Sequence, residues 1–199
     1  VRRDLNVLVV SAETTRAVRW PLPAGPWRED LSQAARADFV IVTRKRASRE
    51  AAEVLAAELR SATRCPIAIA HLGLSRLEGL RSGQSVPPST LAGRRVVAAS
   101  AIADPEAFVA QTKATGAAVQ VATWNDHHDY RPEDIAWLAH AARRADHLVI
   151  TEKDAVKLRE RWPSDAPEPL VAVLDLTWEA GGDAFAVALE AVVTPTERL

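Results

Sequence analysis

The 199-residue sequence contains no methionine and one cysteine, Cys65. A single cysteine cannot form an internal disulfide, which excludes a small disulfide-stapled fold and makes the cytoplasm the expected compartment. No apolar run approaches the ~20 residues of a membrane-spanning helix. The 25 basic and 26 acidic residues nearly balance, which argues against a general nucleic-acid-binding protein.

Two glycine-rich phosphate-binding motifs are also missing, since neither GxxxxGK[ST] nor GxGxxG occurs. The chain therefore has no phosphate-cradling loop of its own. A strand-like run, Leu5–Val10, follows almost at once on Val1. Together with the missing methionine, this run predicts that the chain is a fragment whose amino-terminal part is missing.

Strand-like apolar runs alternate with helical patterns along the whole chain, which predicts an α/β fold with a parallel sheet. The expected strands cover residues 5–10, 38–42, 66–74, 95–99, 117–122, 147–150 and 170–176. The expected helices cover residues 31–37, 48–62, 106–115, 132–144 and 182–193, with a further short helix capped by Thr151. The polar, turn-rich stretch 79–92 is expected to be an excursion between two halves.

The densest acid–base cluster is Asp126-His127-His128, which Asp129 and Tyr130 follow directly. It lies between the strand expected at 117–122 and the helix expected at 132–144, where open α/β sheets place their ligands. Histidine titrates near physiological pH, so this cluster is a candidate for proton transfer. The alternative is a solvated loop whose acids cap the next helix.

Two further segments carry candidate ligand-binding charges. Prolines and a glycine at 21–26 fix the backbone and would present Arg28 and Glu29 in a defined place, although both can equally be solvated charges on a rigid connector. The basic run Arg44–Arg46 can attract an anionic ligand or a lipid headgroup, or simply be solvated.

Thr151 opens a helix with Asp154 three residues on, a pattern similar to a capping box. A helix cap is a sufficient structural explanation for the presence of Thr151 and Asp154. Functionally, Thr151 and Lys153 would face the same strand-end cleft as His127, because both segments follow strands of one parallel sheet.

Four segments, in order, resemble the tetraacyldisaccharide 4'-kinase (lipid A 4'-kinase) family. They are residues 3–10, similar to the strand after that family's DDGFQHR motif; 22–29, similar to its LLPAGPLRE loop; 126–130, similar to its DHH-x-[YF] motif; and 151–158, similar to its TEKDAVKL segment. The resemblance implies a kinase that transfers the γ-phosphate of ATP to the 4' hydroxyl of a tetraacylated glucosamine disaccharide 1-phosphate. It also implies a peripheral protein at the cytoplasmic face of the bacterial inner membrane.

The resemblance further implies a parallel-sheet, three-layer α/β/α lobe, Rossmann-like and related to P-loop kinases, as a fragment of a two-lobed protein. Residues 1–20 would be the last strand and connector of the missing amino-terminal lobe. Residues 21–180 would form the carboxyl-terminal lobe, and the final helix in 181–199 would pack on the missing lobe.

Site residues follow from the same resemblance. His127 matches the histidine that pairs with an aspartate of the missing lobe to activate the sugar hydroxyl, and Asp126 accompanies it. The residues expected to bind the nucleotide are Arg28, Glu29, Thr151 and Lys153. ATP and Mg²⁺ are the implied cofactors, with no metal ligand in this chain. The implied partners are the lipid A disaccharide precursor and, through the missing amino-terminal part, the membrane surface, but not nucleic acid.

Three positions depart from the family pattern: Ala101 and Ala103 stand where the family has glycines, and Asn125 replaces the residue that usually precedes DHH. An alternative function is therefore a non-catalytic α/β module, a degenerate paralogue that binds an acylated sugar or a protein partner. A glycosyltransferase-like nucleotide-sugar domain shares the α/β pattern, but the sequence lacks a DxD motif.

Overall fold

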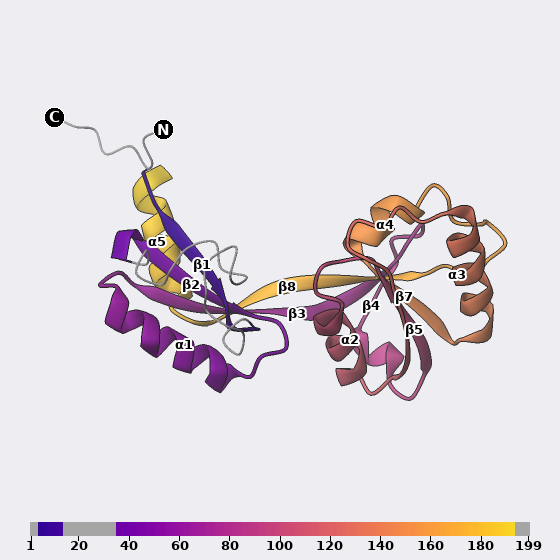
Figure 1. Ribbon diagram of the computed structural model, residues 1–199, viewed down its shortest axis with the longest axis horizontal. Coiled ribbons are helices and arrows are strands. Elements are labelled where there is room, and N and C mark those ends of the chain that lie inside the picture. The colour runs from indigo at the N-terminus through magenta and orange to yellow at the C-terminus, as the bar shows by residue number, and fades with distance from the viewer. Residues whose placement is uncertain (1–3, 14–34, 194–199) are drawn as a thin grey trace. The chain divides into compact units, whose positions relative to one another are not determined.

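The structure is a computed structural model that describes residues 4–13 and 35–193 (Figure 1). It shows an α/β protein with a mixed, mostly parallel sheet. The strands are β1 (Val7–Ser11), β2 (Phe39–Arg44), β3 (Ile67–Gly79), β4 (Ser85–Val86), β5 (Arg95–Ser100), β6 (Ala118–Thr123), β7 (His147–Thr151) and β8 (Leu170–Ala180). The helices are α1 (Arg49–Ala62), α2 (Pro105–Ala114), α3 (Pro132–Arg144), α4 (Glu152–Leu158) and α5 (Gly182–Val193), with a 3₁₀ turn at Pro88–Leu91. The strand order is β1-β2-β3-β8-β7-β5-β6, and β4 pairs with β3.

The chain divides into two compact units. Unit 2 is the continuous segment Gly73–Asp175, and unit 1 is made by the described residues on either side of it. Strands β3 and β8 both run from one unit into the other. The domain boundaries expected at residues 20 and 180, and a preceding lobe that packs on the first strand and the final helix, stay predictions.

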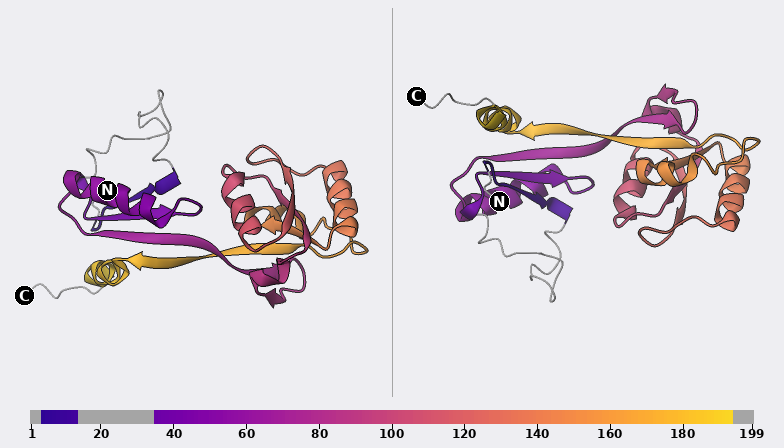
Figure 2. Two further views of the ribbon diagram at one scale, coloured as in Figure 1. Left: turned by 90° about the horizontal axis from the view of Figure 1, so that it is seen from below. Right: turned by 90° about the horizontal axis from the view of Figure 1, so that it is seen from above.

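Unit 1 is built on the parallel strands β1, β2 and β3. Helix α1 begins where expected, because the Ser48 hydroxyl accepts the Ala51 amide. Its buried face, which includes Leu55 and Leu59, packs on one side of these strands. On the other side, Phe185 of α5 meets Phe39 edge-on at 5.1 Å between ring centroids. Figure 2 shows α1 (violet) and α5 (yellow) on opposite sides of the strands.

A glycine is required where β8 turns into α5. Gly181 has a φ of +69°, which L side chains rarely adopt, and a Cβ there would lie 2.7 Å from the Ile67 carbonyl oxygen. This close approach lets α5 fold back on the strands of unit 1.

In unit 2 the parallel strands follow the order β8-β7-β5-β6. Helices α3 and α4 bury residues such as Leu138 and Leu158 on one face of these strands. Helix α2 covers the other face with Phe108. Asp104 caps α2, and Pro105 occupies its first position, one residue before the start expected at 106.

The structure differs from the sequence-based expectation in two places. Strands β3 and β8 are longer than expected, because their polar residues interrupt the apolar pattern yet pair with one another: Arg76 contacts Glu78 at 2.7 Å and Asp175 at 3.4 Å. The excursion expected at 79–92 contains β4, which pairs with β3 in antiparallel fashion.

Most of the helix expected at 31–37 lies outside the described residues. Within the described part of the chain, every helix is too short or too polar to cross a bilayer.

Candidate functional site at the carboxyl ends of β5, β6 and β7

Three neighbouring parallel strands end at one edge of unit 2. The register pairs Ser100 of β5 with Thr123 of β6, and Ala99 of β5 with Ile150 of β7. The Asp126 to Tyr130 cluster therefore follows the end of one strand, and the Thr151 cap follows the end of another. This is the edge at which parallel α/β sheets bind ligands.

His127 stands on a tight turn directly after β6. The His128 amide donates to the Asn125 carbonyl oxygen at 3.1 Å, which closes the turn. His127 has a φ of +63°, the left-handed conformation typical of the third residue of a type II turn. Its side chain is 89% exposed, so the turn holds the imidazole out toward solvent.

The carboxylate of Asp126 contacts both the backbone and the ring of His127. One carboxylate oxygen accepts the His127 amide at 3.1 Å, and the other lies 3.4 Å from Nε2 of the imidazole. An exposed imidazole beside a carboxylate is a combination of groups that acid–base catalysis uses. The pair can therefore act as a proton acceptor for a group that approaches the carboxyl edge.

His128 points the other way and fixes the loop. Its Nε2 lies 2.8 Å from Oδ2 of Asp134 on α3, and its ring stacks on Trp124 at 6.0 Å between centroids. His128, together with the Arg131 amide, holds the pKa of the Asp134 carboxyl below its usual range. The adjacent histidines thus have different surroundings, one exposed and one bound to α3.

Helix α4 and the residues after it hold the backbone of the same loop. The Lys157 ammonium donates to the His128 carbonyl oxygen at 2.9 Å. The Arg161 guanidinium donates to the Asp129 carboxylate at 3.1 Å and to the Tyr130 carbonyl oxygen. These contacts hold the backbone of the loop, while the His127 side chain stays exposed to solvent.

A fully buried carboxylate, Asp154, joins the ends of two strands, β5 and β7. It accepts the Ala101 amide at 3.2 and 3.3 Å and the Thr151 hydroxyl at 2.6 Å. The buried Tyr130 hydroxyl lies near it without a hydrogen bond of normal geometry. Burial, and then the Asp154 charge, raise the pKa of Tyr130 well above its usual value.

The site residues predicted from the sequence lie in different surroundings in the structure. His127 and Asp126 come together at the carboxyl edge, whereas the hydroxyl of Thr151 is bound to Asp154. Lys153 is exposed on α4, and no hydrogen bond or ion pair to another described residue occupies its ammonium. Arg28 and Glu29 lie outside the described residues.

Sequence reasoning missed the positioning roles of Asp154, Lys157 and Arg161. Asp154 was expected only as part of a helix cap. The spacing of 154, 157 and 161 places the three on one side of a helix and the turn that follows it. That common side was the available signal, although nothing local shows which loop it contacts.

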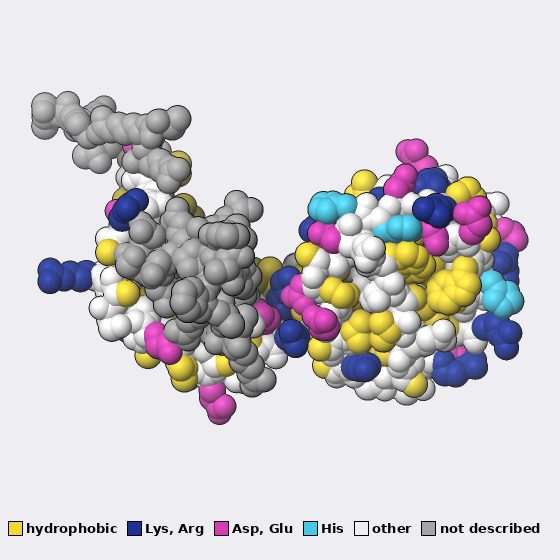
Figure 3. Space-filling model, in the orientation of Figure 1, with side chains coloured by type: hydrophobic (Ala, Val, Ile, Leu, Met, Phe, Trp, Pro, Cys, Tyr) yellow, Lys and Arg dark blue, Asp and Glu magenta, His cyan; other side chains and the backbone are white. Residues whose placement is uncertain are grey.

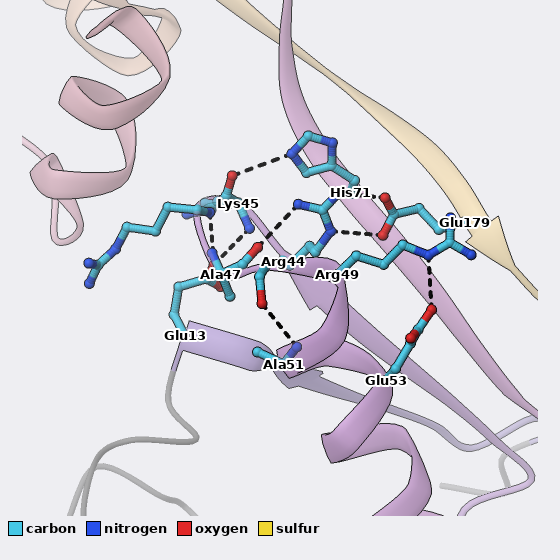
Figure 4. A network of polar contacts seen from close by, with 11 residues as sticks. Glu13, Arg44, Lys45, Ala47, Arg49, Ala51, Glu53, His71 and Glu179 are labelled. Atoms are coloured by element: carbon cyan, nitrogen blue, oxygen red, sulfur yellow. Dashed lines mark hydrogen bonds and ion pairs between the residues drawn. The ribbon is translucent and has the colours of Figure 1, made fainter. Parts of the chain in front are cut away.

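The basic run Arg44–Arg46 in unit 1 forms hydrogen bonds with glutamates of its own unit (Figure 4). The Arg44 guanidinium donates to both carboxylate oxygens of Glu179. One carboxylate oxygen of Glu13 accepts three successive amides, those of Lys45, Arg46 and Ala47, at 2.8 to 2.9 Å. The amides thus form a backbone nest of the kind that binds anions, and here they bind a side chain of the same chain.

The nest predicts an acid-sensitive contribution to stability. Burial raises the pKa of Glu13, but the amides of residues 45–47 and the Ser11 hydroxyl outweigh it and lower the pKa to about 2. A carboxyl whose pKa is depressed on folding stabilises the fold above its unfolded value of about 4.5, and this stabilisation is lost as the pH falls toward 2. Replacing Glu13 with glutamine should lower the free energy of unfolding at pH 7 by about 1–2 kcal/mol, the exposed part of the side chain being screened by solvent.

Urea unfolding of the unsubstituted protein and of the Glu13→Gln variant, at pH 7 and at pH 2.5, measures this effect. The two free energies of unfolding should converge at the lower pH. A difference that stays constant between these pH values would show that the Glu13 charge does not contribute.

No metal centre is evident in the described part of the chain. Nowhere in residues 4–13 and 35–193 do three or more histidine, cysteine, aspartate or glutamate side chains gather in a way that could hold a metal ion.

The fold and this site define an α/β protein with an exposed histidine–aspartate pair at the carboxyl edge of parallel strands. A family model described as tetraacyldisaccharide-1-P 4'-kinase matches residues 1–194. The chain is 38% identical over 162 residues to tetraacyldisaccharide 4'-kinase of Geobacter metallireducens, covering 79% of this chain and 45% of that protein. It is 34% identical over 198 residues to the enzyme of the same name from Anaeromyxobacter dehalogenans (strain 2CP-1), covering 96% of this chain and 52% of that protein.

Among solved structures, the "apo" form of LpxK from Aquifex aeolicus in complex with ATP has the same fold. The TM-score is 0.64 at 21% identity, and the match covers 97% of this chain and 54% of that chain. The chain belongs to the tetraacyldisaccharide 4'-kinase (LpxK) family, a family of kinases of lipid A biosynthesis. It spans about half the length of the relatives that it matches.

Proposed function

We propose that this chain is the second lobe of a kinase that transfers the γ-phosphate of ATP to the 4' hydroxyl of a tetraacylated glucosamine disaccharide 1-phosphate. Family membership supports the reaction class. The main observation in support of the proposal is the Asp126–His127 pair. It lies on a turn at the carboxyl edge of the sheet, with the His127 side chain exposed. A transferase of this kind needs an oriented hydroxyl and a proton acceptor.

In this proposal His127 accepts the proton of the 4' hydroxyl as that oxygen attacks the γ-phosphorus, and ADP leaves with the electrons of the broken bond. Asp126 stabilises the imidazolium, and by resemblance an aspartate outside this chain also pairs with His127. Lys153, exposed beside the same edge, supplies a positive charge for the phosphates. Thr151 acts through Asp154, whose carboxylate it helps to hold.

In this proposal ATP and Mg²⁺ are bound mainly by the part of the protein outside this chain. The described residues form no group that fits Mg²⁺, so no step here passes through the metal. A P-loop in the other lobe would cradle the phosphates, with Arg28 and Glu29 facing the nucleotide by resemblance. The lipid substrate then implies peripheral attachment to the cytoplasmic face of the bacterial inner membrane.

The experiment that tests this function compares the whole protein with the 199-residue chain. We measure transfer of labelled phosphate from ATP to the disaccharide 1-phosphate, and ATP hydrolysis without acceptor. The whole protein should transfer phosphate, and the chain alone should do neither, because it contains no phosphate-cradling loop.

Either of two results would contradict the proposal. Kinase activity of the chain alone would show that it is not a dependent lobe. A whole protein that binds the disaccharide without phosphorylating it would favour a non-catalytic binding module.

A further inference from the structure

A groove of about 640 Å³ lies at the opposite end of the unit 2 strands from His127. Its floor is formed by the amino ends of β5 and β6, and its wall by the second half of α3. Strand β6 is the last in the strand order and pairs only with β5. The groove is thus open along the edge of the sheet.

The groove carries positive charge. Arg95, His140 and Arg144 line it, and none of the described residues that line it is an aspartate or glutamate. Arg95 lies 3.4 Å from the Asp146 carboxylate, which offsets part of its charge. Arg144 and His140, in contrast, make no hydrogen bond or ion pair with any residue in the described ranges. Arg144 therefore brings to the groove a positive charge that no acid of the described ranges balances in an ion pair, in a chain whose net charge is −1.

The groove also has an aromatic wall and an apolar floor. The Trp137 side chain borders it and is 44% exposed, and the edge-on contact with Trp124, at 6.2 Å between centroids, holds its ring. Ala141 contributes apolar surface between the charges, and Val97 lies buried in the floor of the groove. Figure 3 shows apolar side chains exposed on unit 2, with histidine, basic and acidic side chains around them.

We propose that this groove binds a small phosphate monoester that carries a planar ring, the chemistry of a nucleoside monophosphate. Its volume lies within the ~300–1,000 Å³ of small-molecule sites. The Arg144 guanidinium matches a phosphate group, to which it can donate two hydrogen bonds. The exposed indole of Trp137 offers a surface on which a planar ring stacks. The site does not depend on the proposed kinase reaction, because it lies away from the carboxyl edge.

The test follows the Trp137 indole N–H signal by NMR in the full 199-residue chain while adenosine monophosphate is added. The Trp137→Phe protein identifies that signal by its loss. Saturable movement of the signal is expected, and Arg144→Gln should weaken binding by about tenfold or more, since one charge-assisted contact is worth at least ~1.4 kcal/mol. The matched control is Arg143→Gln, because the neighbouring Arg143 pairs with Asp165 and does not line the groove.

Adenosine and inorganic phosphate, added separately, test the two halves of the proposal. Each should bind at least tenfold more weakly than the monophosphate. Equal binding of adenosine would overturn the role of the cations, and equal binding of phosphate would overturn the role of the ring. No movement of the Trp137 signal with the monophosphate would refute the site. Movement only with an acidic peptide would instead indicate strand addition to the free edge of β6.

Discussion

Replacing His127 with alanine in the whole enzyme is expected to lower kcat by ~10²-fold or more while ATP still binds, because the variant loses the group that takes the proton of the attacking hydroxyl. The exposed side chain packs against no core residue, so the fold should persist. Steady-state kinetics with the disaccharide substrate measures kcat, and calorimetric titration with ATP measures nucleotide binding. Replacing Asp126 with asparagine should give a smaller loss, since the imidazolium then lacks its neighbouring charge.

Glu133→Ala is the matched control for this experiment. Glu133 is an exposed acid in the first turn of α3, close in sequence to the histidine but outside the proposed machinery. Its replacement should leave kcat unchanged within twofold. If His127→Ala turned over as fast as the control, the assignment of the proton acceptor would be wrong.

The second large effect is expected at Asp154. Alanine at this position leaves the Ala101 amide and the Thr151 hydroxyl without their buried acceptor. Loss of a buried, charged hydrogen-bond acceptor costs about 2–4 kcal/mol of unfolding free energy. For a chain of this size that loss lowers Tm by roughly 10 °C. Thermal unfolding followed by circular dichroism gives the shift.

Two comparisons distinguish loss of the Asp154 hydrogen bonds from a general destabilisation of helix α4. Asparagine at 154 keeps one oxygen acceptor, so its destabilisation should be smaller than that of alanine. Glu152→Ala alters an exposed acid in the same first turn and should change Tm by only 1–2 °C. Equal Tm values for Asp154→Ala and Glu152→Ala would rule out the structural role assigned to the buried carboxylate.

Local signals in the sequence predicted much of the fold. Helix α3 begins at Pro132 as expected, because a proline fits the first helical position. Helices α1 and α2 likewise begin within one residue of the expected positions, 48 and 106. The extended ends of β3 and β8 could not be predicted, because Arg76 and Asp175 interrupt the apolar pattern and find each other only across strands.

The place of the site could be predicted, but not the residues that support it. A loop between a strand and a helix of an α/β sheet must lie at the carboxyl edge, which located His127. The bond from Lys157 to the His128 carbonyl joins residues 29 positions apart, and no local pattern reports such a contact. Ala101, directly after β5, packs its methyl group into the core of unit 2.

The interruption of unit 1 by unit 2 has a consequence for synthesis on the ribosome. Unit 2 is one continuous segment and can fold once residue 175 has emerged. Unit 1 must wait for the end of β8 and for α5, whose Phe185 covers Phe39. Until then the early strands β1 and β2 expose apolar surface on that face. The nascent chain therefore passes through a stage at which a chaperone can bind this surface.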